Sequence, residues 1–139
     1  MTGMERVFID TSGWVALFVG NDTNHANAVK IYESLKDAKA QLYTSDYVID
    51  ETITTILVRG SHRQAIAAGN AILASKVVKI IAINQQYFVS AWKLFQKYED
   101  KKFSFTDVTS FAVAADMNIK KAFSYDSDFA QVGIELCRP

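Results

Sequence analysis

Residues 8–14 carry the sequence FIDTSGW, the stretch that decides the fold. The apolar run 7–9 is typical of a buried strand, yet it ends at once in Asp10, Thr11 and Ser12. Taking a carboxylate out of water costs free energy unless a partner compensates its charge. A buried strand that ends in an acid and two hydroxyls therefore indicates a polar site at the edge of a sheet, and we expect a metal ion as the partner.

The rest of the chain alternates short apolar runs with longer amphipathic ones. Strands separated by helices of this length are typical of a parallel sheet that helices cover on both faces. We therefore expect an α/β fold, a three-layer α/β/α sandwich around a central, mostly parallel sheet of about five short strands. The pattern predicts strands over 7–9, 41–44, 77–81, 122–124 and 134–136 and helices over 24–35, 46–59, 63–74, 85–98 and 106–117, the last capped by Thr106.

The composition is that of one globular domain, which we place at residues 1–139. Hydrophobic residues make up 50% of the chain and charged residues 22%, which excludes a disordered protein. The apolar runs are too short to span a membrane, the start of the chain has no signal-peptide pattern, and Cys137 is the single cysteine. We therefore expect a cytoplasmic protein. The net charge of zero lacks the basic surplus of a dedicated duplex-DNA-binding protein.

Acidic residues cluster in the sequence where the predicted strands end and the helices begin. They are Asp10, Asp46, Asp50, Glu51, Asp107, Asp126 and Asp128. Carboxylates that share one sheet edge repel each other unless a cation compensates, and Mg²⁺ prefers such oxygen ligands. Taken singly, Asp46 and Asp107 are explained equally well as helix caps. Asp10 is not, because no clear helix start follows it.

Four pieces of the sequence together resemble the PIN domain, and within it the VapC-type toxins of prokaryotic toxin–antitoxin pairs. They are FIDTSGWVALF, DYVIDETITTILVRG, FSFTDVTSFAVA and FSYDSDFAQVGI. No single piece is specific, but the four follow in the matching order at matching distances. With their spacing they cover nearly the whole chain.

The resemblance places the four acidic positions of the family, which are catalytic and metal-binding, on Asp10, Glu51, Asp107 and Asp126. Helix periodicity alone does not choose between Asp50 and Glu51. Other polar residues of the same pieces are expected to assist, Asp128 as a further metal ligand, a second acid behind the ligands or a cap. Thr11, Ser12, Thr106 and Ser124 are expected to support the metal-bound carboxylates or water.

The activity that the resemblance implies is metal-dependent hydrolysis of RNA phosphodiester bonds by an endoribonuclease. Mg²⁺ or Mn²⁺, as one or two ions, lowers the pKa of a bound water and offsets the charge of the phosphate. A cation also reconciles a neutral protein with a polyanionic substrate. The family further implies a cognate antitoxin as partner and a homodimer. The apolar helices around 53–58 and 66–73 are candidates for the dimer interface and, equally, for the core.

Other enzyme classes fit the sequence less well. A haloacid-dehalogenase-like phosphatase also has an Asp after its first strand but needs DxDxT, and Ser12 stands where its second Asp is required. A receiver domain needs an Asp after the third strand, where Ile81, Ala82 and Ile83 stand. A PIN-like module that binds RNA or protein without cutting is the alternative that remains, and the intact acids count against it.

Several other residues were weighed for a role. His25 and His62 are expected to be structural or exposed, Cys137 an ordinary cysteine, and Trp14 a core residue that is also a candidate wall of the site. The aromatic residues at helical spacing, Phe88, Trp92, Phe95 and Tyr98, are expected in the core, with RNA stacking as the less favoured interpretation. The basic residues with a possible contact to RNA or antitoxin are Arg59, Arg63, Lys101 and Lys102.

Overall fold

A computed structural model describes residues 4–139 and has a single five-stranded sheet at its centre. Its strands are β1 Arg6–Ile9, β2 Gln41–Ser45, β3 Val78–Ile81, β4 Lys121–Phe123 and β5 Glu135–Leu136. The strand order is β3-β2-β1-β4-β5, and every neighbouring pair is parallel. The predicted domain begins at residues 1–3, which lie outside the described residues.

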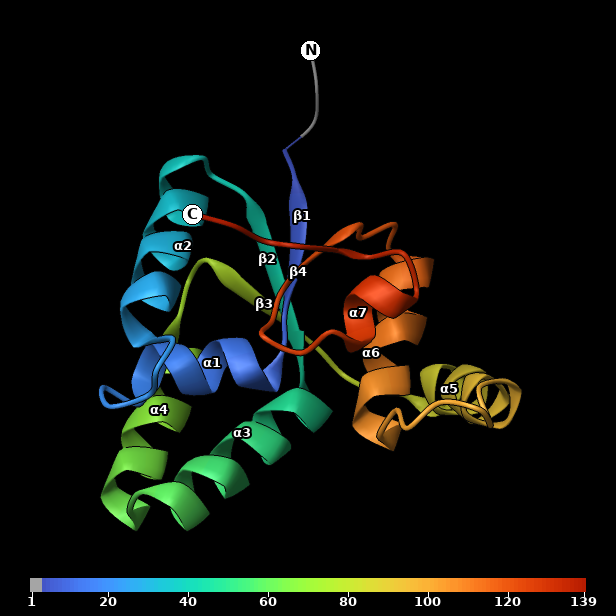
Figure 1. The fold of residues 1–139 in the computed structure, drawn as a ribbon, viewed down its shortest axis with the longest axis horizontal. Helices are drawn as coiled ribbons and strands as arrows, with labels where there is room; N and C mark the ends of the chain where they lie inside the picture. The colour runs from blue at the N-terminus through green and yellow to red at the C-terminus, as the bar shows by residue number, and fades with distance from the viewer. Residues whose placement is uncertain (1–3) are drawn as a thin grey trace.

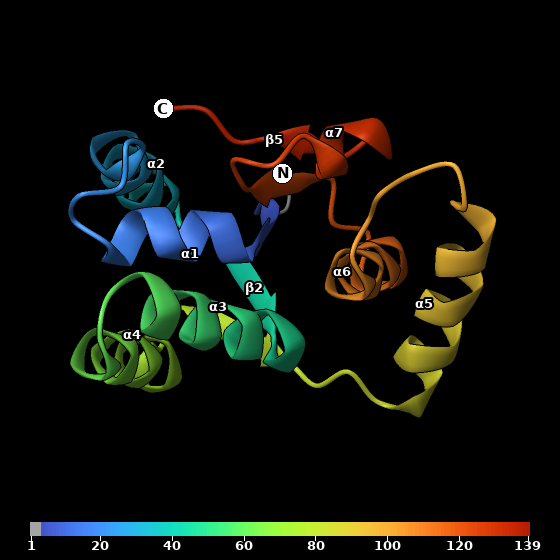
Figure 2. The ribbon, with the colours of Figure 1, turned by 60° about the horizontal axis from the view of Figure 1, so that its bottom comes forward.

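Helices cover both faces of this sheet, as Figures 1 and 2 show. They are α1 Thr11–Phe18, α2 His25–Asp37, α3 Asp46–Arg59, α4 His62–Ala74, α5 Gln85–Lys97, α6 Phe105–Asp116 and α7 Asp128–Gln131. Helices α1, α2 and α4 lie on one side and α5 to α7 on the other, so the predicted α/β/α sandwich is confirmed. No helix within residues 4–139 combines the length and the apolar character needed to cross a membrane.

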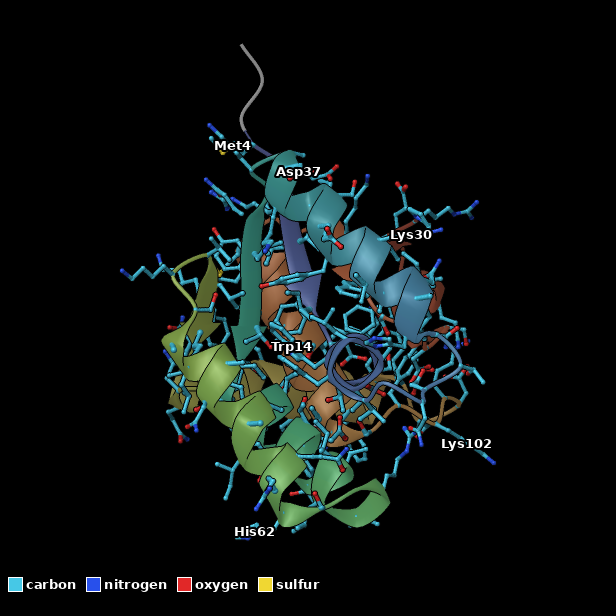
Figure 3. All side chains as sticks on the ribbon, turned by 90° about the vertical axis from the view of Figure 1, so that its left-hand side faces the viewer. Met4, Trp14, Lys30, Asp37, His62 and Lys102 are labelled. Carbon is cyan, nitrogen blue, oxygen red and sulfur yellow. The ribbon has the colours of Figure 1, made fainter. Side chains whose placement is uncertain are left out.

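The central strand β1 carries the core. Val7, Phe8 and Ile9 are 0% exposed because β2 and β4 flank the strand and helices cover it. Trp14 lies between α1 and the sheet (Figure 3), as expected of a core residue. Its indole Nε1 donates to Thr44 Oγ1 at 3.1 Å, and this hydroxyl donates to the Ile9 carbonyl at 2.9 Å. The end of β1 is thereby fixed before the chain leaves the sheet.

The helix α1 was not predicted, and the expectation that no helix follows Asp10 was wrong. Asp10 is in fact the N-cap residue of α1, in extended backbone conformation, and Thr11 begins the helix. Gly13 allows this helix to approach the sheet, because a Cβ there would lie 2.4 Å from the Phe123 carbonyl oxygen of β4. Gly13 is therefore required by the packing of α1 on the sheet.

The start of α6 and the environment of α5 also differ from expectation. Ser104, not Thr106, caps α6: its hydroxyl accepts from Asp107 N, and the Asp107 carboxylate accepts from Ser104 N. Of the four aromatic residues expected in the core, Tyr98 packs against it, while Phe88, Trp92 and Phe95 of α5 do not belong to it, because this helix packs on α6 with nothing outside it among the described residues. Phe88 and Phe95 are each 41% exposed and Trp92 50%.

Candidate active site

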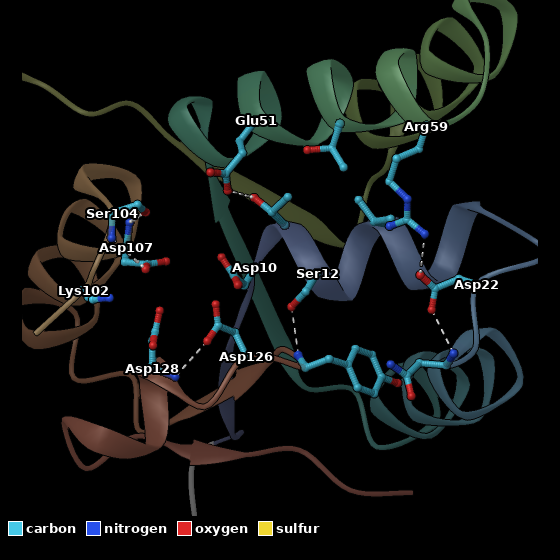
Figure 4. A pocket seen from close by; sticks show the side chains of 15 residues that line it. Asp10, Ser12, Asp22, Glu51, Arg59, Lys102, Ser104, Asp107, Asp126 and Asp128 are labelled. Carbon is cyan, nitrogen blue, oxygen red and sulfur yellow. Dashed lines mark hydrogen bonds and ion pairs between the residues drawn. The ribbon is translucent and has the colours of Figure 1, made fainter.

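A pocket of about 430 Å³ opens beyond the carboxyl ends of β1, β2 and β4, the edge where ligands of parallel sheets bind (Figure 4). A loop or helix follows each of these strands at this edge, so side chains that are distant in the sequence lie close together there. The acids that line it are Asp10, Asp22, Glu51, Asp107, Asp126 and Asp128. Asp46 and Asp50 do not line it, so Glu51 is the one acid that α3 contributes to the pocket lining.

Asp10 is the most deeply buried of these acids, 3% exposed. Its Oδ2 accepts a hydrogen bond from Ser124 Oγ at 3.1 Å, while its Oδ1 is buried with no hydrogen-bond partner among residues 4–139. A buried carboxylate oxygen left unpaired costs free energy in a folded protein. Such an atom, aimed at a pocket of acids, is the arrangement expected of a cation ligand.

Asp107, Asp126 and Asp128 form a tight group, with one carboxylate oxygen of each lying within 4.8 Å of those of the other two. The capping box with Ser104 fixes Asp107, and Asp126 Oδ1 accepts from Asp128 N at 3.1 Å. Asp128 begins the short helix α7, so it joins the cluster from its first turn. Three hard oxygen donors at this spacing suit a divalent cation such as Mg²⁺.

Hydroxyl groups hold the acids in place. Thr11 Oγ1 donates to Glu51 Oε1 and so ties α3 to the start of α1. Ser124 contacts Asp10, lies 3.1 Å from Ser12 Oγ and accepts from Asp126 N at 3.1 Å. Ser12 Oγ in turn accepts from Tyr125 N at 2.8 Å. Three of the four predicted supporting residues therefore contact the acids or their neighbours.

The acids raise one another's pKa. Burial raises the pKa of Asp10 from 3.8 to about 6, against hydrogen bonds from Thr11 and Ser124 that lower it, and the charges of Glu51 and Asp126 add to the rise. Burial, followed by the hydrogen bond to Asp128, also raises the pKa of Asp107. The pKa of Asp126 is raised for the same first reason. Without a cation, the site holds protons that carboxylates normally release by neutral pH.

The structure brings together only part of the predicted basic set. Arg59 and Lys102 line the pocket, whereas Arg63 and Lys101 are not among the described lining residues. Arg59 pairs with Asp22 at 3.4 Å at the end of the pocket away from the acid cluster (Figure 4). Thr106 does not line the pocket either; its carbonyl accepts from Thr109 and Ser110 inside α6.

Sequence reasoning missed six lining residues: Val15, Asp22, Asn24, Thr55, Ser104 and Tyr125. The S-x-x-D spacing of Ser104 and Asp107 is a capping-box pattern that identifies the first turn of α6. No sequence pattern marks Asp22 or Tyr125, because a loop and the end of β4 bring them to the pocket. Tyr125 Oη donates to Asn27 Oδ1 and so joins this end to α2.

Three residues weighed for chemistry are structural. His25 Nδ1 lies 2.9 Å from the Ala16 carbonyl and joins α2 to α1, while His62 is exposed at the start of α4. Burial raises the pKa of the Cys137 thiol to about 11, so the thiol stays protonated and unreactive at neutral pH.

The sheet order and the acidic pocket define a class of protein, and comparison with known families agrees. The family model described as the PIN domain matches residues 7–135. The chain belongs to the PIN-domain family.

Within this family the chain is similar to VapC proteins. It is 35% identical over 133 residues to a Mycobacterium tuberculosis protein named 23S rRNA-specific endonuclease VapC20, covering 96% of this chain and 98% of that protein. It is 27% identical over 124 residues to the VapC ribonuclease of Archaeoglobus fulgidus, covering 88% of this chain and 78% of that one.

Solved structures support the same grouping. The crystal structure of M. tuberculosis VapC20, described as a sarcin–ricin loop cleaving toxin, superposes with a TM-score of 0.88 at 34% identity, over 96% of this chain and 99% of that one. VapBC2 of Rickettsia felis, bound to a fragment of promoter DNA, superposes with a TM-score of 0.70 at 12% identity, over 94% and 96%. The second likeness concerns the fold alone.

Proposed function

We propose that this protein is a metal-dependent endoribonuclease and the toxin of a toxin–antitoxin pair. The observation that carries the proposal is the convergence of Asp10, Glu51, Asp107 and Asp126 on one pocket, with a buried, unpaired oxygen on Asp10. Relatives named endonuclease and ribonuclease at 35% and 27% identity support the activity.

The site fits a divalent cation, Mg²⁺ or Mn²⁺, as one or two ions. Asp10 and the group Asp107, Asp126 and Asp128 offer oxygen donors alone, which suits hard cations. Glu51 completes the set from the opposite wall. When bound, such an ion acidifies a water that attacks the phosphodiester and neutralises charge on the phosphate.

The chain's own residues orient the carboxylates and bind the RNA. Thr11 and Ser124 hold Glu51 and Asp10 by donating hydroxyl hydrogens, which keeps the carboxylate oxygens aimed at the pocket. Ser104 fixes Asp107 through its capping box. Lys102 and Arg59 supply positive charge at the pocket wall, where an RNA phosphate or a residue of the antitoxin is bound. Arg63 and Lys101 remain proposed contacts outside the pocket.

The substrate that we propose to test first is large ribosomal RNA. The relative that matches nearly the whole chain is named a 23S rRNA-specific endonuclease, and its structure is described as that of a sarcin–ricin loop cleaving toxin. Cleavage of ribosomal RNA requires a protein located with ribosomes, in accord with the cytoplasmic location that the sequence predicts.

A protein partner is part of the proposal. VapBC complexes among the structural neighbours contain a toxin with its antitoxin, and we propose an antitoxin for this chain. We also propose a homodimer. Leu57, Val58, Ile66 and Leu73 are 45 to 79% exposed on α3 and α4 and offer an apolar surface for either protein contact. Ile56 and Ile72 on the same helices are buried in the core. One face of these helices therefore belongs to the core, and we propose the other face as the dimer interface.

The test is cleavage of 23S rRNA and a panel of folded RNAs by the purified chain with Mg²⁺, with Mn²⁺ and with a chelator. Asp10→Asn and Asp107→Asn remove pocket acids, and Asp50→Asn, an exposed acid of the same helix as Glu51, is the matched control. Metal-dependent cutting that the first two variants lose and the control retains supports the proposal. No cutting by the unaltered chain, with calorimetry showing no metal binding, would leave the non-catalytic PIN-like binding module in its place.

A further inference from the structure

Helix α5 exposes a row of aromatic side chains, Phe88, Trp92 and Phe95, which we call the α5 platform. Each ring packs on Phe105 of α6, with centroid distances of 5.1, 6.3 and 6.0 Å, and each stays 41 to 50% exposed. Trp92 and Phe95 stack at 5.9 Å with 18° between their planes. The rings are thus held in place, and Trp92 is 50% exposed. A fixed, solvent-facing aromatic surface is suited to stacking.

The platform adjoins the active-site pocket. A groove of about 590 Å³ is lined by Trp92, Phe95, Lys101 and Lys102, among others, and Lys102 also lines the acidic pocket. The first turn of α6 makes the same connection, because Phe105 supports the platform while Ser104 and Asp107 face the pocket. Lys102 lies on this side of the acid cluster in Figure 4.

The charge of this surface is opposite to that of the pocket. Of the residues that line the groove beside the platform, Lys101 and Lys102 are basic and Glu99 is acidic, which gives a net charge of +1. Lysines beside open aromatic rings suit a ligand with alternating phosphates and bases. A divalent cation would be repelled by the lysines, and an acidic peptide would use only the lysines and leave the rings in water.

We propose that the α5 platform, together with Lys101 and Lys102, is a stacking subsite for unpaired bases of the RNA next to the cleaved bond. The proposal rests on the proposed ribonuclease function and names a structural requirement on its substrate: bases outside a duplex. Stacking tolerates any base, because every base has a π face, so the subsite selects unpaired RNA and not a sequence.

A second copy of the chain is the competing occupant of this surface. Three aromatic side chains exposed by half or less present on the order of 300 Å², whereas a stable dimer needs about 800 Å² per partner. The lysines would also meet lysines across a two-fold axis. The exposed apolar residues of α3 and α4 are aliphatic and offer no aromatic ring for stacking, and we place the protein contacts there.

The test is RNA binding in a chelator, where cleavage does not interfere. The probe is a fluorescein-labelled hairpin with an unpaired loop, beside a duplex of equal length. Trp92→Ala should weaken hairpin binding by about tenfold and leave duplex binding unchanged, while Trp92→Phe keeps most of the affinity. Val77→Ala, an apolar residue that is 51% exposed just before β3, is the control. Lys101→Ala should reduce the salt dependence of hairpin binding by about 0.7 in logarithmic slope.

Fluorescence gives a direct readout, because Trp92 is the exposed one of two tryptophans and Trp14 is buried. Loop RNA should quench the emission of the unaltered chain and leave that of Trp92→Ala unchanged. Equal hairpin affinity of Trp92→Ala and the unaltered chain, or no hairpin binding at all, overturns the subsite. The subsite is also overturned if Trp92→Ala converts a dimer to a monomer in sedimentation without a loss of RNA affinity. A chain that binds through Trp92 yet cuts no RNA with Mg²⁺ retains the subsite and refutes the nuclease.

Discussion

Replacing Asp10 by asparagine should stabilise the metal-free protein while it abolishes cleavage. The pKa of Asp10 is about 6 in the folded chain and 3.8 in its ordinary state. This difference corresponds to about 3 kcal/mol of folding free energy lost when the group is ionised. Asparagine fills the same space and still accepts the Ser124 hydrogen bond, but it has no charge to bury.

The sign follows from proton binding. Below pH 4 the carboxyl is protonated in both folded and unfolded chains, and its ionisation contributes nothing. As the pH rises from about 4 to 6, the unfolded chain releases the proton while the folded chain keeps it, so stability falls by about 1.4 kcal/mol per pH unit. Above pH 6 the loss is complete, and Asp10→Asn escapes it.

Urea unfolding in a chelator, at several pH values between 3.5 and 8, measures this difference. The stability of Asp10→Asn minus that of the unaltered chain should increase by about 3 kcal/mol across the window. Any constant cost of the amide appears at the acid end and cancels. Asp50→Asn, exposed on α3, should show no such increase. A difference independent of pH would refute the argument that burial of Asp10 destabilises the metal-free fold.

Three further outcomes test other parts of the site. Saturating Mg²⁺, at 100 times its dissociation constant, should stabilise the unaltered chain by about 2.7 kcal/mol in thermal unfolding, and Asp126→Asn should gain less. Gly13→Ala should destabilise the fold by about 2 kcal/mol or more in urea unfolding, because its Cβ would meet the Phe123 carbonyl at 2.4 Å, whereas Gly20→Ala, with open space around it, should be tolerated. Ser124→Ala removes a hydrogen bond that lowers the pKa of Asp10, so the acid limb of the cleavage pH profile should move to higher pH; an unmoved limb would show that Ser124 does not tune Asp10.

The parallel sandwich could be predicted because its signals are local. Short β-branched runs alternate with amphipathic helices, and the ends of β1, β2 and β4 are marked by an acid or hydroxyl. Helix α1 escaped prediction because Gly13 and two hydroxyl residues are poor helix formers, and only the close approach to β4 explains them. Local propensity was overruled there by tertiary packing.

The prediction that the aromatic row of α5 lies in the core was wrong for a related reason. Spacings of three and four identify residues that share a face of a helix but not whether another layer covers that face. Helix α5 lies at the outer side of α6, so its face is shared between Phe105 and solvent. Ile80 on β3 is 37% exposed for the same kind of reason, since β3 is an edge strand.

The acids of the candidate site could be predicted from their positions at strand ends. The sequence pattern did not predict which of these acids lie together in the pocket. Asp50 and Glu51 are neighbours, and only the family resemblance and then the structure distinguish the exposed acid from the one at the pocket. Arg59 reaches the pocket because α3 runs along it, whereas Arg63 lies beyond the turn into α4. Such choices depend on helix direction, which a sequence pattern does not contain.

The pairing of β1 with β4 has a consequence for the order of synthesis. Asp10 emerges first from the ribosome, yet the hydroxyl that orients it belongs to Ser124, and Asp126 follows two residues later. A nascent chain that stops before β4 lacks two strands of the sheet, the hydroxyl of Ser124 and the carboxylate of Asp126. The cutting site is therefore assembled only after β4 and the residues that follow it have been made.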